Sequence, residues 1–205
     1  MRGPTVSVAY FQRPQANRLA KIPAAGGVWH RTGDLGYLDA EGRVWFCGRK
    51  ADRIEWPAGS WLFSDPVENV FNQHPSVFRS ALVRGPESKG SAAAGVQPVI
   101  VIEPLPHYFP HTARARADFA RELHALGSRF ALTAGLTRFA FHAGLPVDRR
   151  HNAKNFRAQL DRWVKRAIES ADETRTVIAH SGVAPHPPQF DGTDSHLFFG
   201  WYHGE

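Results

Sequence analysis

Cysteine is almost missing from the sequence, since Cys47 is the only one in 205 residues. An internal disulfide and a metal cluster held by several thiolates are therefore excluded, and a reducing compartment is indicated. No apolar run approaches the length of about 20 residues that a membrane-spanning helix needs, and the N-terminus lacks the apolar core of a signal peptide. We therefore expect a soluble, cytoplasmic protein with no membrane span.

Motifs for metal or phosphate binding are also lacking. The 11 histidines occur in no HExxH arrangement, and a CxxC pair cannot form, so no metal site is predicted. Residues 85–95 combine glycine, serine and alanine but contain no GKS or GKT sequence after a strand. The sequence therefore predicts no glycine-rich phosphate loop.

Basic residues outnumber acidic ones, 25 to 19, which gives a net charge of +6. Such a charge raises the question of a nucleic-acid partner, but the arginines are scattered rather than clustered. A basic, solvated surface is the simpler interpretation, and nucleic acid is not expected as a partner. Anionic small molecules such as nucleotides suit a basic protein equally well.

The hydrophobic pattern predicts an α+β protein in two parts. The first part, residues 1–49, is β-rich. Polar and apolar residues alternate over 5–11, which predicts a strand. A short helical piece follows over 17–22, and a hairpin covers 32–49. A charged segment at 50–53 then marks a joint between the two parts.

The second part, residues 54–172, combines a short sheet with flanking helices. Asp65 suits the N-cap of its first helix, and Glu68 stands where a capping box places an acidic residue. Residues 173–205 show no period, so we expect a loosely ordered tail. The predicted helices cover 65–75, 112–130 and 153–170, and the predicted strands cover 77–83, 96–103 and 139–142.

The hairpin over 32–49 carries one charge on each side of its open end. Counting outward from the Asp39–Gly42 turn places Asp34 across from Arg49, allowing for a one-residue bulge. The two residues form either a surface ion pair, worth about 0.2–1 kcal/mol, or two halves of a binding site. A carboxylate accepts two hydrogen bonds from a vicinal diol such as a ribose, and a guanidinium donates to the same sugar or to a phosphate.

Four basic residues crowd the start of the helix predicted over 153–170, namely Arg149, Arg150, His151 and Lys154. Cations are unfavourable at the positive end of a helix, whereas cations and free N–H groups together suit an anion. Either these side chains extend into water, or they form an anion-binding site.

These segments together resemble the adenylate-forming enzymes, which include acyl-CoA synthetases, luciferases and the adenylation domains of peptide synthetases. RGPTVSVAYFQRP (2–14) is similar to the family's RGP…GY…RP segment. Residues 32–34 carry its TGD motif, and Gly48-Arg49 carry its GR motif. The resemblance covers residues 2 to about 168.

The resemblance implies a domain plan. Residues 1–49 would be the end of a large N-terminal adenylation domain, and 54–172 a small C-terminal lid domain. The hinge between them would lie at Lys50, Ala51 and Asp52. The family commonly has Asp or Lys at the position of Ala51, so this chain departs from the pattern there.

The resemblance also implies roles for the charged residues. Asp34 and Arg49 would contact the ribose of ATP or AMP. Lys154 would be the catalytic lysine that bridges the acyl carboxylate and the α-phosphate. It follows Asn152-Ala153, where most members of the family have Ser-Gly. The family also uses Mg²⁺, whose ligands are not in this chain.

Within the family, WFCGRKADR (45–53) and VDRRHNAKNFR (147–157) resemble most the olefin β-lactone synthetases. In that branch a β-hydroxy fatty acid is activated as its acyl-adenylate, and the β-hydroxyl group then displaces AMP to close a β-lactone. Fatty acyl-CoA ligases share most of these residues, so a fatty acid substrate and thioester formation stay open.

The family's phosphate loop and acyl pocket precede the RGP segment, and the sequence lacks both. We therefore expect the C-terminal part of a longer enzyme, inactive without a separately encoded N-terminal portion. The alternative is a non-catalytic, truncated remnant or a protein-interaction module. Its mark would be an exposed apolar surface near Tyr10, Phe11, Leu35 and Trp45.

Overall fold

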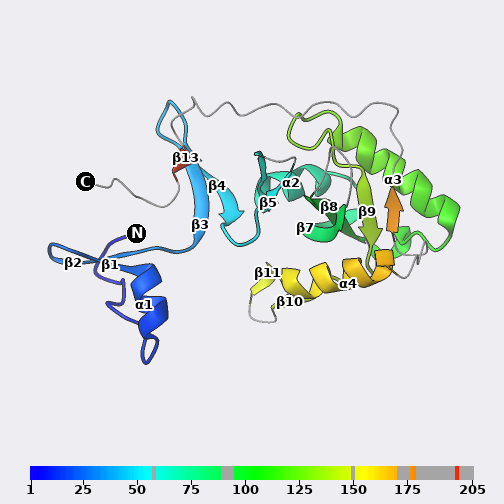
Figure 1. Cartoon of the computed structure of the whole chain (residues 1–205). Coiled ribbons are helices and arrows are strands. Elements are labelled where there is room, and N and C mark those ends of the chain that lie inside the picture. The colour runs from blue at the N-terminus through cyan, green and yellow to red at the C-terminus, as the bar shows by residue number, and fades with distance from the viewer. Residues whose placement is uncertain (57–58, 89–94, 149–150, 170–175, 179–196, 199–205) are drawn as a thin grey trace. The chain divides into compact units, whose positions relative to one another are not determined.

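Figure 1 shows the computed structural model of the chain, which describes residues 1–56, 59–88, 95–148, 151–169, 176–178 and 197–198. The contacts divide these residues into two compact units. The first contains Met1–Ala51 and strand β13 (Leu197–Phe198), and the second begins at Asp52 and contains the other described residues. The boundary falls inside the segment where the sequence predicts a hinge. Rotation at that hinge stays a prediction.

The first unit begins with bends and turns rather than with the strand predicted over 5–11, and that prediction is wrong. The side chain of Asn17 replaces a neighbouring strand, because its Oδ1 accepts from the Tyr10 N–H at 2.6 Å and its Nδ2 donates to the Tyr10 carbonyl at 3.0 Å. Helix α1 (Pro14–Ala20) then leads into a hairpin of β1 (Lys21–Ala24) and β2 (Gly27–His30). The helix predicted over 17–22 therefore ends two residues early.

The hairpin of β3 (Asp34–Leu38) and β4 (Val44–Arg49) has the predicted arms and turn. Gly42 has a φ of 77°, the left-handed value that closes the turn. The register pairs Asp34 with Arg49 and shifts between Leu35 and Gly36, as a bulge requires. Strand β13 pairs with the other edge of β3, and the sequence does not predict this pairing.

The second unit contains a four-stranded sheet in the order β12-β9-β8-β7. Strands β7 (Val77–Ser88) and β8 (Gly95–Pro104) are antiparallel, and β9 (Arg138–Phe141) lies parallel to β8. A parallel neighbour requires a crossover connection, which α3 (Ala113–Gly127) provides, after the 3₁₀ turn η1 (Pro106–Tyr108). The predicted strands are confirmed, whereas β12 (Thr176–Ile178) falls in the segment expected to be loose.

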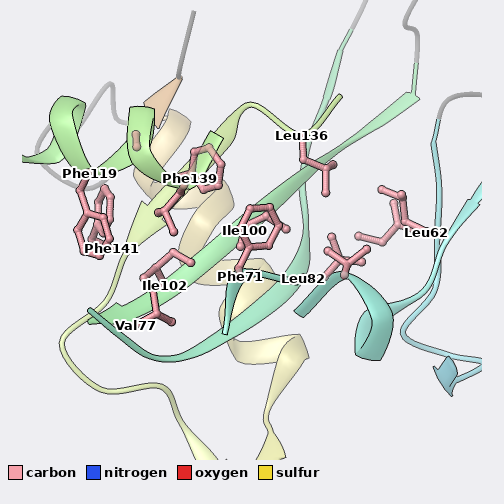
Figure 2. Close-up of a cluster of buried hydrophobic side chains, with 14 residues drawn as sticks. Leu62, Phe71, Val77, Leu82, Ile100, Ile102, Phe119, Leu136, Phe139 and Phe141 are labelled. Carbon is pink, nitrogen blue, oxygen red and sulfur yellow. The ribbon is translucent and has the colours of Figure 1, made fainter. Parts of the chain in front are cut away.

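Two apolar clusters cover the two faces of this sheet. Helices α2 (Ser64–Phe71) and α3 pack on one face, where Phe71 meets Phe139 edge-to-face with their ring centroids 5.6 Å apart (Figure 2). Helix α4 (Arg157–Glu169) packs on the other face through Leu160 and Val164. The predicted α+β class, with a short sheet flanked by helices, is therefore confirmed.

Four short strands and the start of α2 complete the second unit. Strand β5 (Ile54–Glu55) pairs with β6 (Trp61–Leu62), and β10 (Val147–Asp148) pairs with β11 (His151–Asn155). Helix α2 starts one residue before Asp65, and its N-cap residue is Phe63, whose side chain accepts no hydrogen bond from the first turn, so the predicted capping box is wrong. Within the described residues, no helix is long and apolar enough to cross a membrane.

Candidate functional site

The open end of the β3–β4 hairpin is the first of two candidate sites, one in each unit. Arg49 Nε lies 3.0 Å from Asp34 Oδ1, and Arg49 Nη1 donates to the Thr32 carbonyl at 2.9 Å. The Lys50 N–H donates to the Gly33 carbonyl at 2.8 Å and continues the pairing one residue beyond β4. The bulge and these bonds hold a carboxylate and a guanidinium side by side.

Both side chains of this pair are accessible to a ligand. Arg49 is 50% exposed and Asp34 35% exposed. An ion pair this exposed contributes little to the free energy of unfolding. Stabilisation of the fold therefore does not explain why these two charges lie at the open end of the hairpin. The paired groups can accept from a vicinal diol and donate to a sugar or phosphate oxygen.

The closed end of the same hairpin is tied by Asp39. Its Oδ2 accepts from the Trp45 indole N–H at 2.7 Å and from Arg43 Nε at 2.6 Å. These hydrogen bonds, with that from Trp45 foremost, hold the pKa of Asp39 below its ordinary value. The turn is therefore anchored by side chains, which makes the hairpin a firm support for the pair at its other end.

The second candidate site is the segment of the second unit that carries Lys154. The structure places this residue on β11, in a short antiparallel hairpin with β10, and not on a helix. Helix α4 begins at Arg157, four residues after the predicted start at 153. The Phe156 N–H donates to the Pro146 carbonyl at 2.8 Å and closes this hairpin.

This boundary corrects the prediction of a basic cluster at a helix N-terminus. His151 and Lys154 lie on β11, and Arg149 and Arg150 lie outside the described residues. The helical period of α4 extends backwards into Ala153, but that residue lies within β11, whose two end residues, His151 and Asn155, pair with β10. The argument from helix charge is therefore lost, and anion binding by these residues stays a prediction.

The three predicted hinge residues form a turn between the units. Lys50 is bonded through its backbone N–H to Gly33 of the first unit. Asp52 is bonded through its side chain to the second unit, where Arg157 Nε lies 3.1 Å from its Oδ2. Ala51 lies between these two anchored neighbours.

Arg157 and Glu68 are the polar residues of the second unit whose importance the sequence did not predict. Arg157 Nη2 lies 3.1 Å from Glu68 Oε2, and Nη1 contacts Glu68 Oε1. Glu68 is buried, and Arg157 is largely shielded from water. Burial raises the pKa of Glu68 above its ordinary value, against the opposing effect of the Arg157 guanidinium. The sequence did contain one signal. Arg157 lies three and seven residues before the buried Leu160 and Val164, and this helical spacing places its charge on the face of α4 that they share.

No group of three or more histidine, cysteine, aspartate or glutamate residues within the described part of the chain could hold a metal ion.

The comparisons with known proteins add the family context. No protein-family model matches the chain. The chain is 45% identical over 166 residues to an olefin β-lactone synthetase of Xanthomonas campestris, a match that covers 78% of this chain and 28% of that protein. It is 43% identical over 176 residues to an olefin β-lactone synthetase of Stenotrophomonas maltophilia, covering 82% of this chain and 29% of the relative.

Solved structures agree on the fold. The chain superimposes on an anthranilate CoA ligase in complex with anthranoyl-AMP with a TM-score of 0.65 at 24% identity. The match covers 82% of this chain and 30% of the ligase. The o-succinylbenzoate CoA synthetase of Bacillus subtilis, in complex with AMP, superimposes with a TM-score of 0.55 at 28% identity, covering 78% of this chain and 28% of the synthetase.

The fold is that of part of an adenylate-forming ligase, as the TGD and GR motifs indicated. Within that class, the chain is related to the olefin β-lactone synthetases, and the expected resemblance to that branch is confirmed. The chain spans less than a third of the length of these relatives, 28% and 29%.

Proposed function

We propose that the chain is part of an AMP-forming ligase that activates a fatty or β-hydroxy fatty acid with ATP. The Asp34–Arg49 pair across the bulged end of the β3–β4 hairpin carries this proposal. In the proposed site, the Asp34 carboxylate accepts from the two ribose hydroxyls of the nucleotide, and Arg49 donates to the same ribose.

Lys154 acts from the second unit in the proposed reaction. The acyl carboxylate attacks the α-phosphorus of ATP, an acyl-phosphate bond forms, and the bond to pyrophosphate breaks. The Lys154 ammonium stabilises the negative charge that builds up on the phosphate oxygens. A lysine suits this task because its charge is compact and lies at the end of a long stem.

The second step depends on the acid that is activated. With a β-hydroxy acid, the hydroxyl oxygen attacks the acyl carbon and releases its proton to solvent, the bond to AMP breaks, and a β-lactone closes. With a simple fatty acid, a thiol such as that of coenzyme A takes the place of the hydroxyl group. The identity of 43–45% to olefin β-lactone synthetases favours the first of these outcomes. Mg²⁺, which would neutralise the leaving pyrophosphate, is expected to be held by residues outside this chain.

Replacement of the matching segment of the Xanthomonas relative by this chain tests the proposal. The chimera should release pyrophosphate and AMP when it receives ATP, Mg²⁺ and a β-hydroxy fatty acid, and the relative without that segment should not. Mixing the chain with the rest of the relative in trans tests whether a separately encoded N-terminal portion suffices. Absence of acid-dependent pyrophosphate release from the chimera, with both β-hydroxy and simple fatty acids, would falsify the proposal.

A non-catalytic interaction module is the second candidate, and exposed apolar side chains of the first unit favour it. Tyr10 is 39% exposed, Phe11 87% and Trp45 48%, whereas Leu35 is buried. Three of the four expected residues are therefore open to a partner. Strong binding of an apolar dye and self-association of the chain would support this candidate, and a monomer that binds no dye would count against it.

A further inference from the structure

The β10–β11 hairpin that carries Lys154 is held at both of its ends. Before it, the Leu145 N–H donates to the buried Glu103 carboxylate at 2.8 Å, and Arg79 Nε lies 2.8 Å from the same Oε2 oxygen. After it, the Phe156 N–H closes the hairpin and Arg157 follows directly. The position of Lys154 within the unit is therefore set by what these two ends contact.

The contacts of Arg157 reach three separate segments of the second unit. Its guanidinium meets both carboxylate oxygens of Glu68 on α2, and Nη1 also donates to the Leu82 carbonyl of β7 at 3.0 Å. Nε lies 3.1 Å from Oδ2 of Asp52, the first residue of the unit. The side chain is only 14% exposed, so these contacts are made largely away from water.

A second arginine joins the same segments. Arg84 of β7 donates two hydrogen bonds: its backbone N–H to Asp161 Oδ1 of α4 at 2.9 Å, and its Nη2 to the Arg53 carbonyl at 2.6 Å. Residues 52 and 53 are thus linked to the first turns of α4 by two independent routes. Rotation of these residues relative to α4 would break both routes at once.

We infer that Arg157 is a positioning residue, which couples Asp52 of the hinge to the hairpin that carries Lys154. The inference rests on the proposed function and deepens it. Any rotation about Ala51 then carries Lys154 as part of a rigid body, because Asp52, Glu68 and the start of α4 share one guanidinium. The planar fork of an arginine suits this role, since it can serve two carboxylates and a carbonyl in a defined geometry.

Hydrogen exchange on the 205-residue chain tests the coupling without any activity. Asp52→Ala removes only the hinge contact and leaves Glu68 paired. We expect the Phe156 amide to lose protection in this variant and in Arg157→Lys, with the larger loss in the lysine variant because its ammonium retains only one carboxylate contact. Arg162→Met, an exposed arginine on the same helix, is the matched control and should leave this amide unchanged.

The chimera described above separates positioning from stability. Arg157→Met alone leaves a buried, unpaired carboxylate, so the double variant Glu68→Met/Arg157→Met is measured beside it. A cooperative thermal transition of the double variant shows that it is folded. Its kcat for adenylate formation should still be about 10–100-fold below that of the unmutated chimera, because Lys154 is misplaced. KM for ATP should be unchanged, because the proposed ribose contacts lie in the first unit.

The two proposals fail differently. Normal kcat in a folded Glu68→Met/Arg157→Met chimera, or unchanged exchange at Phe156 in Asp52→Ala, overturns the role of Arg157 and leaves the ligase function intact. An inactive unmutated chimera overturns the ligase function, and the exchange experiment then still decides whether Arg157 joins Asp52 to the hairpin.

Discussion

The two units of the chain differ most in how much apolar surface their strands and helices bury. In the second unit, both faces of the four-stranded sheet are covered by helices, and residues such as Val67, Phe71 and Phe139 are fully buried. Among the described residues of the first unit, Leu35 and Cys47 are the only buried apolar ones. The described strands and hairpins of the first unit therefore bury far less apolar surface than those of the second unit.

This contrast fits the relationship to longer enzymes. The second unit has the two layers of helix on a sheet that a small domain needs for independent stability. The first unit exposes several large apolar side chains, including Val44, Phe46 and Phe11. Division of the chain near Ala51 therefore separates a unit with two buried apolar clusters from one whose described apolar side chains are mostly exposed.

The largest effect is expected when the two units are expressed separately. A fragment of residues 52–178 should unfold cooperatively with a midpoint close to that of the whole chain, because it retains both apolar clusters. A fragment of residues 1–51 should show no cooperative transition and should bind an apolar dye. Thermal melts followed by circular dichroism check both. A cooperative transition in the short fragment would remove the contrast.

Substitution of one phenylalanine in each unit gives the next largest effect. Phe71→Ala should lower the free energy of unfolding by about 3–5 kcal/mol, because the ring is fully buried against Phe139. Phe46→Ala, at a site 55% exposed, should change it by less than about 0.5 kcal/mol. Urea denaturation of both variants provides the comparison. Equal losses would show that the first unit buries Phe46 after all.

Asp34→Asn sharpens the comparison between structural and functional charges. Its cost in stability should be only about 0.2–1 kcal/mol, because the pair with Arg49 is exposed. In the chimera the same change should raise KM for ATP if the carboxylate binds ribose. Asp39→Asn is the matched control, since it removes a charge at the other end of the same hairpin. An equal rise in KM for both variants would argue against ribose binding by Asp34.

The smallest effect is a dependence on pH in the first unit. Partial burial, then the neighbouring Lys21 and N-terminal charges, lower the pKa of His30 from 6.5. Lys21 Nζ lies 2.6 Å from His30 Nδ1, so protonation of the ring would face an ammonium group. The unfolded chain then binds more protons than the folded chain below pH 6.5, and stability present above that pH is lost as the pH falls.

NMR titration of the His30 ring checks this expectation directly. The ring should titrate below the 6.5 of an unperturbed histidine. Lys21→Met should move the pKa upward by removing the ammonium charge, whereas Lys50→Met should not move it. A pKa at or above 6.5 in the unmutated chain would contradict the expected sign.

Elements with strong local signals were predicted well from the sequence. The Asp39–Gly42 turn fixes the register of the β3–β4 hairpin, so the pairing of Asp34 with Arg49 could be counted outward from it. The strands over 77–83 and 96–103 were recognisable because a buried strand is an almost continuous apolar run. In each case the information lies within a few residues of the element itself.

Elements that depend on distant partners were not predicted. The alternation over 5–11 suggested a strand, but the Asn17 side chain takes the hydrogen bonds there. The segment around Lys154 has a helical period, yet it pairs with β10. The salt bridge of Arg157 joins residues 89 positions apart, and no local pattern shows which acidic residue such an arginine meets.

The single cysteine has a practical consequence for the first unit. Cys47 lies on β4, is only 4% exposed, and has no other thiol in the sequence to compete with it. A thiol reagent can reach its sulfur only while the β3–β4 hairpin is open. The ratio of reaction rates in the chain and in an unfolded peptide therefore measures the opening equilibrium of the hairpin, with no label introduced. Unmodified protein thus carries a reporter of how firmly the Asp34–Arg49 end is supported.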